Sequence, residues 1–301
     1  MPFAGRRMDL DNRRSPLNRW WSGLVASVNP GHQPGSTTQG SYVVGWDGVG
    51  YTFDNYNRDP RRLSALLDRG LARFHQNPPR QVSIPAEYMQ AAAPHRPPAS
   101  VSVIRVFTRI RPLPAGEPPE FTWLGRDHMW IFADEVRQML AASENNNQPF
   151  PMPRTLLARL VVFHIIDNTR GQVVPWKPQD VSKADFTMRA IRNASGRRTF
   201  TFRGDFAKRG RTDFFTNRGH EGHIEGELDV GIKTEKIVRF RAYGEAQAWA
   251  EAPTFRPTNP PRGRYPLVIA MVEANDALGQ CAAPEVAETG SYYEHIQLPL
   301  P

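Results

Sequence analysis

Two short stretches combine a histidine with a carboxylate, the pairing that supplies general-base chemistry. Asp127 and His128 are adjacent, and Asp167 is the third residue after His164. A carboxylate that accepts a hydrogen bond from an imidazole orients the ring and stabilises its protonated form. These four residues are therefore the candidate catalytic site of a metal- or His/Asp-dependent, hydrolase-like enzyme.

A nucleophile to accompany these groups is missing from the sequence. It contains no Gly-x-Ser-x-Gly motif, and Cys281, the single cysteine, has no basic neighbour in its polar tail. His164 stands between two apolar residues, which is typical of a hydrogen-bonded core histidine. The loop with Arg126 and the turn at 167–170 would form one polar cluster only if the fold brought them together. The sequence favours a non-enzymatic protein.

His220 and His223 are the nearest approach to a metal motif. Two histidines three apart can chelate an ion on a turn, with Asp213 or Glu225 adding a carboxylate. On a strand, residues three apart point to opposite faces, and the helical zinc signature needs histidines four apart. The favoured interpretation is an exposed turn without a metal. No cofactor is expected, because the glycines of 42–53 lack the residues of a phosphate-binding loop.

Positive charge is concentrated in one part of the chain. The formal net charge is +8, and residues 189–218 hold nine Lys or Arg residues against Asp205 and Asp213. Such a segment attracts phosphate, anionic lipid or an acidic protein, and its plainest structural interpretation is a solvated hairpin tip. The predicted partner-binding residues lie in this segment and in a tryptophan pair near the N-terminus: Trp20, Trp21, Arg197, Arg198, Arg203, Lys208, Arg209, Arg211, Phe214 and Phe215.

Aromatic residues interleave with this charge, as they do in platforms that stack single-stranded nucleic acid. However, Phe200, Phe202 and Phe206 share the face that is predicted to be buried, and stacking requires them beside the arginines. Only Phe214 and Phe215 stay available. Nucleic-acid binding through residues 189–218 is therefore a second alternative, after the enzyme.

Alternation of apolar and polar residues predicts the strands that carry these groups. It runs through 199–208, 223–232 and 237–248. Period-2 alternation with one apolar face is typical of strands half buried in an antiparallel sheet.

The last two of these strands predict a hairpin around residues 233–236, in one of two registers. In the first register Asp229 faces Arg241; in the second, two residues tighter, Asp229 faces Arg239 and Glu227 faces Arg241. Both keep acid near base, whereas a slip of one residue would put the apolar face in water. The carboxylates are therefore interpreted as cross-strand partners.

The whole chain is predicted to be α+β: a predominantly antiparallel β-meander, as an open sheet or partial barrel, with a few short helices and long Pro-rich loops. The other predicted elements are a strand–turn–strand over 42–53, a helix from Asp59, a strand over 100–109, a helix over 133–142, a buried strand over 160–167, and strands over 181–190 and 265–274.

Four parts are predicted along the chain. They are an extended or partly disordered arm at 1–41, with a short helical turn as an alternative at 16–28, an α+β part at 42–150, an antiparallel β part at 151–279 and a tail at 280–301. Residues 42–279 are alternatively one domain. No run of about 18 apolar residues and no signal peptide is visible. A soluble protein is therefore expected, either in the cytoplasm or periplasmic or peripheral, and the sequence does not choose between these.

Four segments carry a resemblance to a protein family: GRDHMWIFADEVRQML, FHIIDNTRGQVVPW, GHIEGELDVGIKTEKIVRFRAYGEA and RYPLVIAMVEAN. Over about 42–275 the chain resembles an uncharacterised bacterial family of planctomycete type. The resemblance implies no activity and no catalytic residue. The leading hypothesis is a non-enzymatic binding or accessory subunit that presents loops and a basic edge to another protein, to a second copy of itself or to an anionic surface.

Overall fold

The computed structural model divides the chain into two compact units, Met1–Pro94 and His95–Pro301. Phe214, Phe215 and most of the predicted arm and tail lie outside the residues that the structure describes. The described residues are 16–29, 31, 40–45, 48–54, 59–78, 97–111, 124–144, 148–169, 176–211, 217–251, 263–280, 282 and 284.

Unit 1 is a small α+β assembly. Its described residues form helix α1 (Pro16–Val28), the hairpin of β1 (Ser41–Val44) and β2 (Gly50–Asp54), and helix α2 (Pro60–Gln76). The predicted start of α2 is confirmed: Asp59 caps the helix by accepting a hydrogen bond from the main-chain nitrogen of Arg61 at 2.9 Å. Within the predicted arm, helix α1 lies where the short helical turn over 16–28 is predicted, and Leu24 and Val25 are buried on one side of it.

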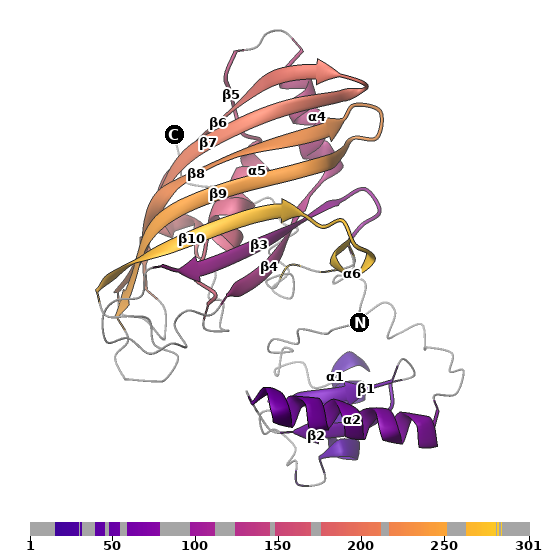
Figure 1. The fold of residues 1–301 in the computed structure, drawn as a ribbon. Helices are drawn as coiled ribbons and strands as arrows, with labels where there is room; N and C mark the ends of the chain where they lie inside the picture. The colour runs from indigo at the N-terminus through magenta and orange to yellow at the C-terminus, as the bar shows by residue number, and fades with distance from the viewer. Residues whose placement is uncertain are drawn as a thin grey trace. The chain divides into compact units, whose positions relative to one another are not determined.

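Unit 2 is built on one antiparallel sheet in the order β4-β3-β10-β9-β8-β7-β6-β5. Figure 1 shows helices α4 and α5 on a single face of this curved sheet, which is called the inner face below. The strands are β3 (Ser102–Ile110), β4 (Gly125–Ile131), β5 (Phe150–Pro151), β6 (Val181–Ala194), β7 (Arg197–Gly210), β8 (Asn217–Gly231), β9 (Lys236–Glu251) and β10 (Arg264–Glu273); the helical elements are α4 (Ala133–Ala142), α5 (Arg154–Arg159), the π-helical turn η4 (Leu160–His164), the 3-10 turn η5 (Pro178–Asp180) and α6 (Ala277–Gln280).

The predicted fold class is confirmed. The sheet is an open antiparallel meander, and the hairpin of β8 and β9 adopts the tighter of the two predicted registers: Asp229 faces Arg239, and Glu227 faces Arg241. A bulge next to Asp229 then shifts Val230 opposite Ile237. Acid therefore stands opposite base on the outer face of the sheet.

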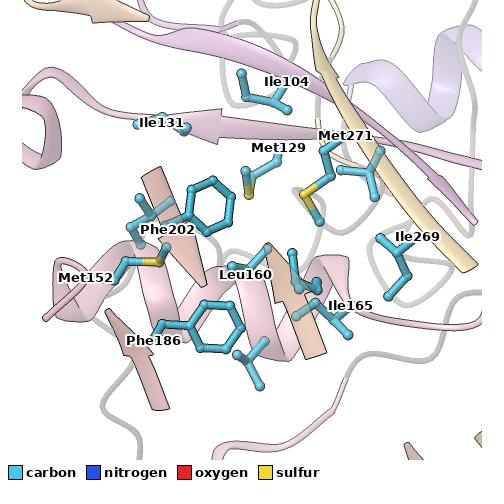
Figure 2. Packing of buried hydrophobic residues seen from close by; sticks show 14 of the residues in the cluster. Ile104, Met129, Ile131, Met152, Leu160, Ile165, Phe186, Phe202, Ile269 and Met271 are labelled. Atoms are coloured by element: carbon cyan, nitrogen blue, oxygen red, sulfur yellow. The ribbon is translucent and has the colours of Figure 1, made fainter. Parts of the chain in front are cut away.

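The buried strand predicted over 160–167 is wrong. This segment continues helix α5 as the π-helical turn η4, and all of its side chains from Leu160 to Ile166 are buried. A helix enclosed by a curved sheet buries every side, so its sequence is as continuously apolar as that of a buried strand. Figure 2 shows Leu160 and Ile165 between side chains from the sheet, among them Phe186, Ile269 and Met271.

The division into units also differs from the predicted boundary near 150. Strand β5 pairs with β6, so the segment around 150 lies within the sheet that β3 and β4 begin. The boundary between the compact units falls at Pro94 instead.

Candidate functional site

Three polar side chains lie on one cross-strand row of the inner face. Tyr265 of β10 pairs with Ala248 of β9, which pairs with His220 of β8, which pairs with Lys208 of β7. Residues directly opposite one another across antiparallel strands point to the same face. The alternation that buries Phe206 therefore also places Lys208 inside the protein, where its exposed fraction is 1%.

The end of the π-helical turn is bound to this row. The Lys208 ammonium nitrogen donates to the main-chain oxygen of Val161 at 2.9 Å and to that of Ile165. Nδ1 of His220 lies 3.2 Å from the same Ile165 oxygen, and the Tyr265 hydroxyl donates to Oδ2 of Asp167 at 2.7 Å. Carbonyl groups at a helix end need such donors, so the row fastens the helix to the sheet.

Burial dominates the electrostatics of this row. It lowers the pKa of Lys208 well below its ordinary value, and nearby Arg218 lowers it further. Both side chains lie over the Trp176 ring: the Lys208 nitrogen is 5.0 Å from the ring centre, and the Arg218 guanidinium carbon is 4.0 Å from it. Burial lowers the pKa of Arg218 to about 10, so this group stays charged at neutral pH.

His220 is held as a neutral ring. Burial and then the nearby Lys208 lower its pKa well below the ordinary 6.5. Since Nδ1 donates to a main-chain oxygen, Nε2 carries the lone pair, and no hydrogen-bond partner reaches Nε2 among the residues that the structure describes. The ring instead packs edge-on against Phe206, with centres 5.2 Å apart.

The structure brings together two of the four candidate catalytic residues. Nδ1 of His164, at the end of η4, lies 2.8 Å from Oδ2 of Asp127 on β4, and both side chains are at most 1% exposed. The other Asp127 oxygen accepts the main-chain N–H of His128 at 2.7 Å. Asp167 is bound to Tyr265 and Thr169.

His128 lies on the opposite face of β4 from Asp127. It stands across from Arg105 of β3, whose guanidinium forms an ion pair with Asp276. Burial lowers the pKa of His128, against the raising effect of Asp127. The alternation of a strand therefore separates His128 from His164 and removes it from a common site.

The segment around Arg126, which is strand β4 and not the predicted loop, does meet the residues after Asp167; Arg170 lies outside the described residues. The Asn168 amide donates to the main-chain oxygen of Arg126 at 3.1 Å, and its oxygen accepts from the Thr108 hydroxyl. Gly125 makes room for it, because a Cβ there would overlap the Asn168 side chain. Thr108, Asn168, Trp176, Arg218 and Tyr265 were all missed by sequence reasoning, although the alternation of their strands could have indicated the inward position of Arg218 and Tyr265.

The predicted exposed turn at His220 and His223 is wrong. Both residues lie within β8, where His220 points inward and His223 outward into solvent. One ion cannot bind both rings. Within the described ranges, no group of three or more His, Cys, Asp or Glu side chains is placed to hold a metal.

The predicted partner-binding residues divide into several environments. Lys208 is buried, so its place on an exposed basic edge is corrected to the interior. Arg198 donates to Oγ of Ser143, at 2.7 Å, and to the main-chain oxygen of Leu140, so it ties β7 to the end of α4. Arg203 stands across from Glu225 on the outer face. The remaining basic residues of the set, Arg197, Arg209 and Arg211, are exposed.

Trp20 and Trp21 pack within unit 1. Their ring centres are 6.2 Å apart, and Trp21 lies edge-on to Tyr42 of the hairpin at 5.1 Å. Both side chains are half-buried. These contacts give the pair a structural role in unit 1.

The inner-face groups are arranged to hold the fold together. Asp127, His164, Lys208 and His220 are each 3% exposed or less, and their hydrogen bonds join the helix, the segment after it and the sheet. General-base chemistry needs a group within hydrogen-bonding reach of a substrate. Asp127 and His164 bind each other, and Lys208 and His220 bind main-chain oxygens, all of them away from solvent.

Replacing Asp127 by alanine tests this structural assignment. We expect the free energy of unfolding to fall by about 2–3 kcal/mol, because the buried His164 ring loses its acceptor. Urea unfolding followed by circular dichroism measures the change. His128→Ala, one residue away on the other face, is the control and should cost less than about 1 kcal/mol. An Asp127→Ala protein as stable as the parent would contradict the assignment, because removing a residue that holds the fold together lowers the free energy of unfolding.

Comparisons of the chain with protein-family models, with curated proteins and with solved structures gave no match. Over the described residues, none of the helices has the length and apolarity needed to cross a membrane.

Proposed function

We propose that unit 2 is a non-catalytic binding module that docks a protein partner at one end of its sheet. The observation that carries the proposal is a surface formed by two adjacent hairpin tips, called the basic tip. It consists of Arg189, Ile191, Arg192, Arg197, Ile232, Lys233 and Lys236.

The two hairpins are joined at this tip. The β6–β7 turn is tight, with positive φ angles of 54° at Ser195 and 73° at Gly196. The main-chain nitrogen of Ile232, in the β8–β9 turn, donates to the Gly196 oxygen at 2.9 Å. The turns therefore present one continuous surface.

Carboxylates close to the basic tip are engaged by other side chains. Asp229 accepts from Arg239 at 2.8 Å and from Thr199 at 2.7 Å, and the hydrogen bond from Arg239 is the main cause of its lowered pKa. Glu235 pairs with Arg137 at 2.5 Å. The basic tip therefore keeps a net positive charge, which attracts and orients an acidic partner.

Apolar side chains stand among these charges. Ile191 is 49% exposed, Ile232 36% and Val238, next to the tip on β9, 37%. Exposed apolar groups that are surrounded by charged ones are typical of protein interaction sites.

Site-specific photo-crosslinking in the native cells tests the proposal. A benzophenone side chain in place of Asn193 or Lys233 should give a discrete covalent adduct with one polypeptide. The same group in place of His223, which is exposed on the outer face of β8, should not. Adducts absent from both tip positions, or equally strong at His223, would overturn the proposal.

A further inference from the structure

Among the described residues, a neighbouring strand covers the outer edge of β6 along only part of its length beside the basic tip. Strand β5 pairs with β6 only at Thr187 and Met188, and the main-chain nitrogen of Met152 adds one hydrogen bond to Phe186. Beyond Met188, no strand in the described part of the chain pairs with the outer edge of residues 189–194. Edge strands of this kind accept an additional strand from another chain.

We propose that residues 189–194 of β6 bind an extended acidic segment of a partner protein as an added strand. The inference rests on the proposed function and specifies the chemistry and conformation of the partner. Main-chain hydrogen bonds to the edge would provide affinity, and alternate side chains of the segment would reach the basic tip.

The positive charge around residues 189–194 favours an acidic partner segment. Between Asp185 and Asp205 the chain contains five arginines, at 189, 192, 197, 198 and 203, and no carboxylate. Arg198 is directed to α4 and Arg203 stands across from Glu225. Arg189 and Arg192 are exposed on the edge strand itself, and Arg197 is exposed on the neighbouring strand, across from Ala194. Side chains at every second position of a strand point to the same face. Carboxylates at alternate positions of an added strand would therefore all lie on the face that carries these arginines.

The same charges argue against a second copy of this chain. Pairing of two β6 edges would bring the arginines of both copies onto neighbouring strands, and like charges across strands are destabilising. A lipid surface matches the charge but offers no strand to complete the edge. An acidic peptide segment satisfies both features.

Fluorescence anisotropy with the full chain provides the test. The probe is a labelled peptide of about nine residues, enough for one strand, in which glutamate alternates with valine. We expect saturable binding at low salt that weakens at about 0.3 M salt, where exposed charges are screened. A peptide with lysine in place of glutamate should not bind.

Two matched comparisons separate charge from strand pairing. The double variant Arg192→Glu/Arg197→Glu should weaken binding at least about tenfold, since each reversal sets like charges together. Arg209→Glu, which reverses an exposed arginine at the other end of β7, should leave binding unchanged. A peptide N-methylated at alternate residues keeps its charge but loses main-chain donors, so it should also bind at least about tenfold more weakly.

Equal binding of the methylated peptide, or no effect of the double variant, would overturn the inference. Binding to phosphatidylserine vesicles that depends on Arg192 and Arg197, without peptide binding, would replace it by a membrane role. If the tip forms a protein adduct in cells but the acidic peptide does not bind, the binding module stands and the acidic added strand is rejected.

Discussion

Replacing Glu135 by glutamine is expected to lower the free energy of unfolding by about 3–5 kcal/mol, because the Arg159 guanidinium stays buried without its counter-charge. Nη2 of Arg159, on α5, lies 2.6 Å from both Glu135 oxygens on α4, and the two side chains are 6% and 3% exposed. Glu135 also accepts the Thr155 hydroxyl at 2.7 Å and the main-chain N–H of Phe132 at 2.9 Å. One carboxylate therefore joins two helices and caps one of them.

Asp134, the neighbouring residue on α4, provides the matched control. It pairs with Arg137, but their side chains are 78% and 51% exposed. Asp134→Asn should therefore cost less than about 1 kcal/mol. Urea unfolding of the full chain, followed by far-ultraviolet circular dichroism, measures both variants.

A double variant, Glu135→Leu/Arg159→Met, shows whether the pair is coupled. It removes both charges and should be more stable than the sum of the two single replacements predicts. Strict additivity would contradict a coupled buried pair. So would a Glu135→Gln protein that unfolds at the same urea concentration as the parent.

The second large effect is a pH dependence of stability that depends on Lys208. Its folded-state pKa is lowered by burial, whereas the unfolded chain has the ordinary value of 10.5. Between these two values the unfolded chain binds a proton that the folded protein lacks, so stability rises with pH. The contribution is about 1.4 kcal/mol per pH unit across that interval.

The measurement compares the parent with Lys208→Met at several pH values from neutral to about 10. The parent should gain stability relative to the variant as pH rises, because only the parent carries the titrating amine. Lys183→Met is the control: Lys183 is exposed, and its hydrogen bond to Asp205 raises its pKa, so it should produce no such gain. A constant difference between parent and Lys208→Met would show that the folded protein keeps Lys208 protonated.

His220 should make the stability depend on pH in the acidic range as well. Its folded pKa is also lowered, so below the ordinary 6.5 the unfolded chain takes up a proton and the folded protein loses stability. His220→Phe, which keeps an aromatic ring beside Phe206, should flatten this acid limb. The same unfolding measurements, made between about pH 5 and 7, detect the change.

The buried groups that stabilise the fold and the basic tip that is proposed to bind a partner lie at opposite ends of the same strands. Arg197 begins β7 in the basic tip and Lys208 lies near the end of that strand, so about 36 Å of strand separates them. Variants of Lys208 and of the basic tip should therefore act independently on stability and on peptide binding.

Local sequence patterns determined most of the strands and their faces. Alternation predicted β7, β8 and β9, and the charge pattern limited the hairpin to two registers. The sequence pattern did not choose between those registers, and it gave no signal for the bulge beside Asp229.

Only the tertiary structure decided the nature of residues 160–167 and the position of the site groups. A continuously apolar run is compatible with a buried helix and with a buried strand, so the sequence pattern does not distinguish the two. The position of this segment inside the curved sheet does. The sequence supplied Asp127 and His164 as candidates, but their pairing depends on strand β4 and turn η4 meeting across the inner face. Lys208 shows the physical reason most directly. Its charge predicted an exposed side chain. In the structure the side chain points to the inner face, where two main-chain oxygens accept its hydrogen bonds and the Trp176 ring lies against it.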